Sequence, residues 1–154
     1  MDPITQQALT QAGAFAAIGF AAVGSALGCG AAGCAAVGAW KKCYAQDRPA
    51  PFQLAVFAGA PLSQTIYGMI LMFLIFGRAA TLGAYWPVFL VLGTLAGIAM
   101  GISAWMQGKA AAGSCDAFAE TGQGFTNYLM ALGIIETVAI FVMAFGIVML
   151  AMIK

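Results

Sequence analysis

One carboxylate stands alone in a long apolar stretch of this sequence. Glu136 is the only charged residue between Thr121 and Ile153. A charged side chain at the centre of a membrane helix costs roughly 2.5–3.5 kcal/mol on insertion scales, so packing alone rarely keeps one there. Intramembrane carboxylates usually carry a proton or an ion. Glu136 is therefore the first candidate for a group that does chemistry.

Four uncharged polar side chains in other apolar stretches could complete a site around it: Ser63, Gln64, Tyr67 and Gln107. Gln64 and Tyr67 are three residues apart, so they share one face of a helix. Amide and hydroxyl oxygens together with a carboxylate form an all-oxygen cage, and hard cations such as Na⁺ prefer oxygen ligands, as calcium and magnesium do. The Tyr67 hydroxyl could donate a hydrogen bond to Glu136 and hold the carboxylate in place.

A proton carrier needs less than this cage, because a carboxyl group in an apolar surrounding is enough. In that case Ser63, Gln64 and Gln107 would only bond neighbouring helices to one another. The residues themselves leave both ions open.

Two further residues flank the candidate site. Pro61 lies two positions before Ser63, and a proline inside a helix removes one backbone hydrogen bond and can kink the helix. The backbone carbonyl of Ala60 then becomes a possible ligand. Thr137 follows Glu136 directly and points about 100° away from it on a helix. We assign Pro61 and Thr137 supporting positions around the site.

The elements that carry these residues must be membrane helices. The chain has 154 residues, of which 63% are hydrophobic and 7% are charged, which is not a soluble globular composition. Residues 3–40, 49–77 and 79–108 form long stretches without a charged residue, and each exceeds the roughly 20 residues that span a ~30 Å hydrocarbon core. With the stretch around Glu136, they predict an all-α membrane protein with four transmembrane helices, at about 12–43, 53–77, 84–109 and 124–153.

This composition also excludes several classes of function. Only short connectors remain between the predicted helices, so the chain has no room for a soluble catalytic domain, and nucleotide hydrolysis within it is excluded. The first apolar stretch is too long for the core of a signal peptide, and we expect it to be a retained helix. The chain has no His and no Cys-x-x-Cys pair, so a zinc site has no support.

Basic residues predict the orientation in the membrane. Lys41, Lys42 and Arg48 lie between the first two predicted helices and Lys109 between the last two, whereas Arg78 and Lys154 mark the opposite side. Because cytoplasmic connectors carry an excess of Lys and Arg, we expect both of these connectors in the cytoplasm and both termini outside.

The second half of the sequence echoes the first. Residues 37–42 match residues 102–107, which lie 65 positions later, and the stretch around Gln64 matches the stretch around Glu136, 72 positions later. On this alignment one hairpin keeps a carboxylate where the other carries an amide. The pattern predicts two tandem helical hairpins, residues 1–78 and 79–154.

The first predicted helix is unusually rich in small residues. Gly24 and Gly28 form a Gly-x-x-x-Gly pair, and small faces let helix backbones approach closely in lipid. A helix this slim along its whole length suits the inner wall of a tightly curved ring.

With these features the chain resembles the duplicated rotor proteolipid of V-type and A-type rotary ATPases, known as the c subunit or, in prokaryotes, the K subunit. The resemblance covers essentially the whole chain. Its most specific parts are residues 61–68 on the second helix and residues 119–122 and 132–137 around the fourth. The glycine-rich first helix and the Gln107-Gly108-Lys109 end of the third helix also fit.

The resemblance implies a closed membrane ring of identical subunits in the lipid bilayer of a cell membrane, with helices one and three inside. Such a ring turns against a stator subunit whose essential Arg displaces the ion from Glu136. The cytoplasmic connectors contact the central stalk, and we assign that contact to Gln46, Asp47, Arg48 and Pro49. The catalytic ATP site lies on other subunits, so the chain is not expected to be an enzyme by itself. No nucleic-acid partner is expected.

Sodium-coupled relatives imply a particular ligand set, which here matches Ser63, Gln64, Tyr67, Gln107, Glu136 and the carbonyl of Ala60. Ser63 stands where Thr is familiar, and relatives tend to carry a bulkier side chain than Ala60. The resemblance therefore predicts Na⁺ as the carried ion, with the same rotor carrying H⁺ as the alternative. An alternative of another class is a small four-helix secondary transporter with one membrane carboxylate.

Overall fold

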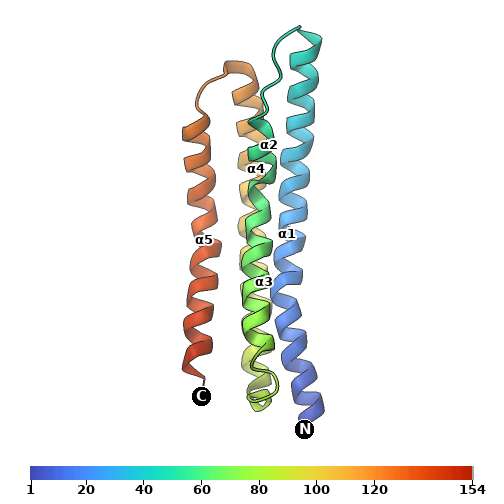
Figure 1. The fold of residues 1–154 in the computed structure, drawn as a ribbon, viewed down its shortest axis with the longest axis vertical. Helices are drawn as coiled ribbons and strands as arrows, with labels where there is room; N and C mark the ends of the chain where they lie inside the picture. The colour runs from blue at the N-terminus through green and yellow to red at the C-terminus, as the bar shows by residue number, and fades with distance from the viewer. Residues whose placement is uncertain (154) are drawn as a thin grey trace.

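Figure 1 shows a bundle of long helices running side by side, in a computed structural model that describes residues 1–153. Lys154, one of the two basic residues on the predicted outer side, lies outside the described residues. The elements in chain order are α1 (Pro3–Ala45), α2 (Leu54–Gly59), the 3-10 helix η1 (Ala60–Leu62), α3 (Ser63–Phe76), the 3-10 helix η2 (Gly83–Tyr85), α4 (Trp86–Thr121) and α5 (Phe125–Met152).

Four helical segments within the described residues are long and apolar enough to cross a membrane. They are Pro3–Ala45, Leu54–Phe76, Gly83–Thr121 and Phe125–Met152. The predicted fold class, an all-α protein with four membrane-spanning helices, is therefore confirmed.

Two helix ends differ from the prediction. α1 begins at Pro3 rather than near residue 12, because Asp2 caps it by accepting a hydrogen bond from the Thr5 backbone N–H at 2.9 Å, and proline is favoured in the first turn. α4 continues to Thr121 rather than ending near residue 109.

Lys109 therefore lies inside α4, and the expectation that it belongs to a connector is wrong. The physical reason is that three alanines follow it, and alanine is the best helix former. The helix ends only at Gly122, whose φ of +66° favours a glycine. Hydropathy and charge indicate where a chain leaves the membrane, which is not where its helix must end.

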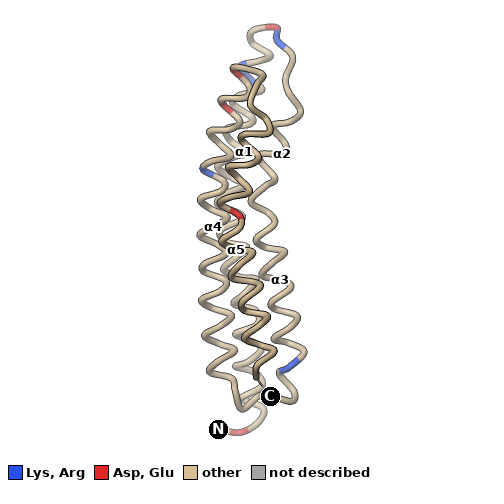
Figure 2. Tube along the Cα trace, turned by 90° about the vertical axis from the view of Figure 1, so that its left-hand side faces the viewer, with Lys and Arg blue, Asp and Glu red and all other residues tan. Residues whose placement is uncertain are grey.

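Charged residues gather at the end of the bundle that holds the α1–α2 and α4–α5 connectors, while both termini lie at the opposite end (Figure 2). The two connectors that we expect on the same side of the membrane do lie at the same end. Which end faces the cytoplasm stays a prediction.

α1 and α4 pack backbone against backbone at the centre of the bundle. A Cβ atom at Gly24 would overlap the backbone of Gly101, and one at Gly28 would meet the carbonyl oxygen of Ala104 and, at 2.9 Å, Pro61. The same helix also carries glycines with nothing within 4 Å of a Cβ atom: Gly30, Gly33 and Gly38. Of these glycines, only Gly24 and Gly28 are needed for the contact between α1 and α4.

The α1–α4 contact corrects one part of the repeat alignment. Lys42 pairs with Glu120, which lies 78 residues later. Positions that lie side by side on α1 and α4 are therefore about this many residues apart in the sequence. Trp105 lines a shallow groove with Leu27, whereas the Trp40 indole donates to the carbonyl of Pro51 in the first connector at 2.8 Å. The match of residues 37–42 to residues 102–107 is therefore not a match of structural position. A Trp preceded by an Ala is a weak signal in two helices so rich in small residues.

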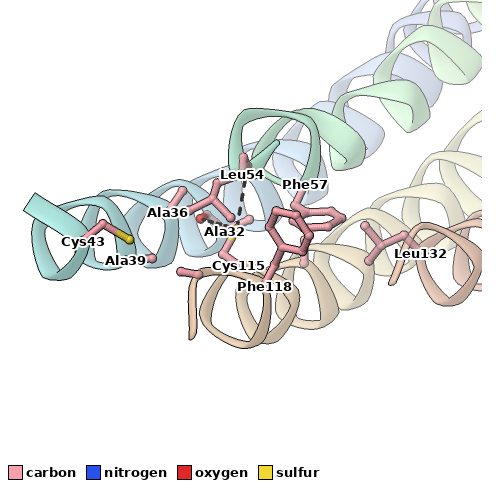
Figure 3. Packing of buried hydrophobic residues seen from close by; sticks show 11 residues of the cluster. Ala32, Ala36, Ala39, Cys43, Leu54, Phe57, Cys115, Phe118 and Leu132 are labelled. Atoms are coloured by element: carbon pink, nitrogen blue, oxygen red, sulfur yellow. Dashed lines mark hydrogen bonds between the residues drawn. The ribbon is translucent and has the colours of Figure 1, made fainter. Parts of the chain in front are cut away.

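A buried cluster closes the connector end of the bundle (Figure 3). The Phe57 ring packs edge-on against Phe118, with centroids 6.1 Å apart, and lies 5.3 Å from Phe125. The thiol of Cys115 contacts the carbonyl of Leu54 at 3.8 Å (Figure 3). These contacts join α2, α4 and α5, and so anchor the helices that carry the polar residues below.

The first connector is tied to the end of α4. Arg48 donates to the backbone carbonyl of Ala119, and Lys42 forms an ion pair with Glu120. Both partners of that ion pair are about half exposed, so the pair adds little stability by itself. Its effect is to hold residues 46–49, the predicted stalk contact, beside the C-terminal end of α4.

Candidate ion-binding site

The break around Pro61 sets up the first part of the site. Proline cannot donate a backbone hydrogen bond, and the chain passes through η1 at Ala60–Leu62 instead of continuing as one α-helix. The Ser63 hydroxyl lies within hydrogen-bond distance of the Ala60 carbonyl oxygen, at 3.2 Å. Pro61 itself is buried. The irregular turn thus brings a backbone oxygen and a hydroxyl together at the start of α3.

A chain of side-chain hydrogen bonds runs from this turn to the carboxylate. Ser63 Oγ donates to Gln64 Oε1 at 3.2 Å, and Gln64 Nε2 donates to Gln107 Oε1 at 2.8 Å. Gln107 Nε2 then donates to Glu136 Oε2 at 3.2 Å. Gln64 and Gln107 are fully buried, and buried amides need such partners. One connected network therefore joins α3, α4 and α5.

Tyr67 holds the other carboxylate oxygen. Its hydroxyl donates to Glu136 Oε1 at 2.5 Å, which is the bond that the sequence predicted. Both oxygens of Glu136 therefore accept a hydrogen bond from a neutral donor. Glu136 remains partly exposed.

Among the predicted supporting residues, Thr137 is not part of the network. Its hydroxyl donates to the Ile134 carbonyl on its own helix at 2.6 Å, and the residue is exposed. The connector residues Gln46, Asp47, Arg48 and Pro49 lie at the end of the bundle. They take no part in the network around the carboxylate, and their contact with a stalk stays a prediction.

Sequence reasoning missed one residue beside the site. Ser103 on α4 donates to the backbone carbonyl of Ile135 at 2.9 Å, and Gln107 also donates to the carbonyl of Leu132 at 3.1 Å. In the sequence, Ser103 is only one of several small residues on the third helix. Its position four residues before Gln107, on the same helix face, is the signal that could have found it.

The arrangement can neutralise and hold one small cation. Carboxylate, amide, hydroxyl and backbone oxygens lie within one hydrogen-bonded network, and each amide oxygen has a second lone pair for a further partner. No group of three His, Cys, Asp or Glu side chains able to hold a metal ion occurs among residues 1–153. Oxygen donors of this kind suit a hard cation or a proton better than a transition metal.

Comparison with known proteins gives one family match, which lies in the second half of the chain. Residues 90–149 match the family model that describes the C subunit of ATP synthase. The matched stretch contains Ser103, Gln107 and Glu136, whereas Gln64 and Tyr67 lie outside it. No curated protein gives a significant match to the chain.

Proposed function

We propose that this chain is the ion-carrying rotor subunit of a V-type or A-type ATPase, and that Glu136 carries Na⁺ across the membrane. Ion movement would be coupled to rotation and to ATP hydrolysis or synthesis on other subunits. One observation carries the proposal. Glu136 lies within a membrane-spanning helix, held by Tyr67 and Gln107, in the stretch that matches the rotor proteolipid family of ATP synthases.

The network around the carboxylate supports Na⁺ over H⁺. A proton needs one oxygen, whereas this chain joins Ser63, Gln64 and Gln107 in one hydrogen-bonded chain that ends at Glu136. Burying two amides costs free energy unless they are paired. A cation that all of these oxygens can share accounts for the whole set, while a proton accounts only for Glu136.

An assembly of identical copies accounts for the remaining apolar surface. A groove of about 740 Å³ opens between α4 and α5, with apolar side chains along it, among them Val91, Leu95, Val142 and Phe145. A helix of the next copy in a ring would fill it. In mild detergent we expect one large ring by mass, and a dimer would instead favour a small secondary transporter.

The partners follow from what the described residues lack. The two arginines, Arg48 and Arg78, lie in the connectors, so the Arg that displaces the ion must come from a stator subunit. Facing lipid, the carboxylate must be neutralised because a bare charge there is too costly. Facing the stator, water and the Arg lower that cost and release the ion. The membrane potential contributes ~2.3 kcal/mol per charge per 100 mV.

The deciding experiment is carbodiimide labelling of Glu136 in the purified assembly, with and without Na⁺ at fixed pH and ionic strength. The reagent attacks a protonated carboxyl in an apolar site. We expect Na⁺ to slow labelling, because it competes with the proton, and K⁺ at equal concentration to leave it unchanged. Labelling that ignores Na⁺ would identify a proton carrier, and a Glu136 that never labels would contradict the rotor proposal.

Variants of the network test the ligand assignment in the same assay. Gln107→Ala removes the donor to Glu136 Oε2 and one amide oxygen. The Na⁺ concentration that gives half protection should rise about tenfold or more, which corresponds to about 1.4 kcal/mol. Gln64→Ile should act in the same direction. Unchanged half protection in both variants would remove these residues from the site.

A further inference from the structure

The helix that carries Glu136 is only lightly held by apolar packing. Along the 28 residues of α5 the buried positions are Leu132, Ala139, Gly146 and Leu150. Half-buried side chains such as Phe125 and Val142 pack toward the two ends of the helix, but between Leu132 and Ala139, the stretch that includes Glu136, no residue of α5 is fully buried. Something else must hold the turn that presents the carboxylate.

Two side chains of α4 supply that restraint. Gln107 and Ser103, one helical turn apart, donate to the backbone carbonyls of Leu132 and Ile135. Both carbonyls lie within four residues of Glu136, and that of Ile135 belongs to the peptide group directly before it. A bond to a backbone oxygen fixes the main chain itself, whichever rotamer the side chains adopt.

The bond from Ser103 is not the one that a helical serine usually makes. Serine inside a helix tends to donate to the carbonyl four residues earlier on its own helix, as Ser114 does to Ala110 at 2.9 Å. Ser103 is also buried, yet its hydroxyl reaches across to Ile135 on α5 at 2.9 Å. This choice of partner links two helices and not two turns of one helix.

The first half of the chain provides an internal comparison. Residues of α1 lie beside residues of α4 about 77 positions later, as the contact between Gly24 and the Gly101 backbone shows, so Ser25 lies at about the same level as Ser103. The Ser25 hydroxyl is buried, and it has no hydrogen-bond partner among the described residues. A hydroxyl at this level bonds a neighbouring backbone only in the half of the chain that carries the carboxylate.

We propose that Ser103 is a positioning residue for Glu136. Its bond to the Ile135 carbonyl, together with the bond from Gln107 to Leu132, holds α5 in the rotation at which the carboxylate meets Tyr67. Without the bond from Ser103, this turn of α5 can rotate toward lipid, and the hydrogen bonds from Tyr67 and Gln107 to the carboxylate then form less often. This inference rests on the proposed role of Glu136 in ion binding.

The test compares Ser103→Ala with Ser114→Ala in the complete purified assembly, using carbodiimide as the probe. Without Na⁺, Ser103→Ala should raise the labelling rate of Glu136 about three- to tenfold, the size expected from one lost hydrogen bond. The Na⁺ concentration for half protection should rise by a similar factor. Ser114→Ala and Ser25→Ala should match the wild type, and Ser103→Thr, which keeps the hydroxyl, should restore both values.

A second measurement reads the bond directly. Isotope labelling of the Ile135 carbonyl isolates its infrared band, which should move to higher frequency in Ser103→Ala and stay in place in Ser114→Ala. An unmoved band, with labelling equal to that of Ser114→Ala, would overturn the inference. If the wild type itself shows no Na⁺ protection, the sodium proposal fails, while the band and the cation-free labelling rate still decide the role of Ser103.

Discussion

Replacing Glu136 with Gln is expected to abolish ion transport by the intact complex while leaving the assembly in place. Both carboxylate oxygens accept hydrogen bonds, from Tyr67 and from Gln107. An amide offers one acceptor and one donor, so its NH₂ group must face one of these two donors. It also carries no charge to exchange with a cation. ATP-driven ²²Na⁺ uptake into membrane vesicles should therefore fall to the level of vesicles without the complex.

A matched control exists in the same chain. Glu120→Gln makes the identical chemical change at an exposed glutamate near the end of α4, where the partner is Lys42. It should leave uptake close to the wild-type value, because exposed ion pairs contribute little and the bond from Arg48 to the Ala119 carbonyl still holds the connector. The ring should have the same mass in all three proteins. Substantial uptake by Glu136→Gln would refute the central claim that this carboxylate carries the ion.

Replacing Gly24 with Ala is expected to prevent correct packing of α1 against α4, although it adds one methyl group. The new Cβ atom would overlap the Gly101 backbone, and a backbone cannot move aside as a flexible side chain can. We expect the free energy of unfolding to fall by at least about 3 kcal/mol, the upper end of the usual cost of overpacking. Thermal unfolding followed by circular dichroism in mild detergent measures it.

The control for this change is Gly38→Ala on the same helix. A Cβ atom at Gly38 meets nothing within 4 Å, so the substitution should be neutral or stabilise α1 by up to ~1 kcal/mol through helix propensity. Equal melting temperatures for Gly24→Ala and Gly38→Ala would mean that α1 and α4 do not touch through their backbones.

The sequence predicted the main polar contacts because those residues have few other uses in a membrane helix. A lone Glu136, two amides and a tyrosine are costly in lipid, so their meeting could be expected before any helix was placed. Pro61 likewise indicated the irregular turn that the chain adopts at η1. Residue type alone carried this part of the prediction.

What the sequence could not predict depends on backbone geometry. The end of α4 was misplaced because hydropathy measures depth in the membrane, whereas Gly122 and the alanines before it decide where the helix stops. Ser103 was missed because its partner is a backbone carbonyl, which every residue has. Thr137 was placed near the carboxylate by sequence adjacency, but its hydroxyl bonds its own helix.

The contrast between the tight α1–α4 contact and the lightly held α5 has a mechanical consequence. Backbone contact at Gly24 and Gly101 leaves no side chains that could re-pack, so we expect the α1–α4 pair to be stiff. α5, with four buried residues, is compliant by comparison. If the chain is the proposed rotor subunit, we expect gain or loss of a charge at Glu136 to be absorbed by local flexing of α5, and torque to pass through the α1–α4 pair to the connector end.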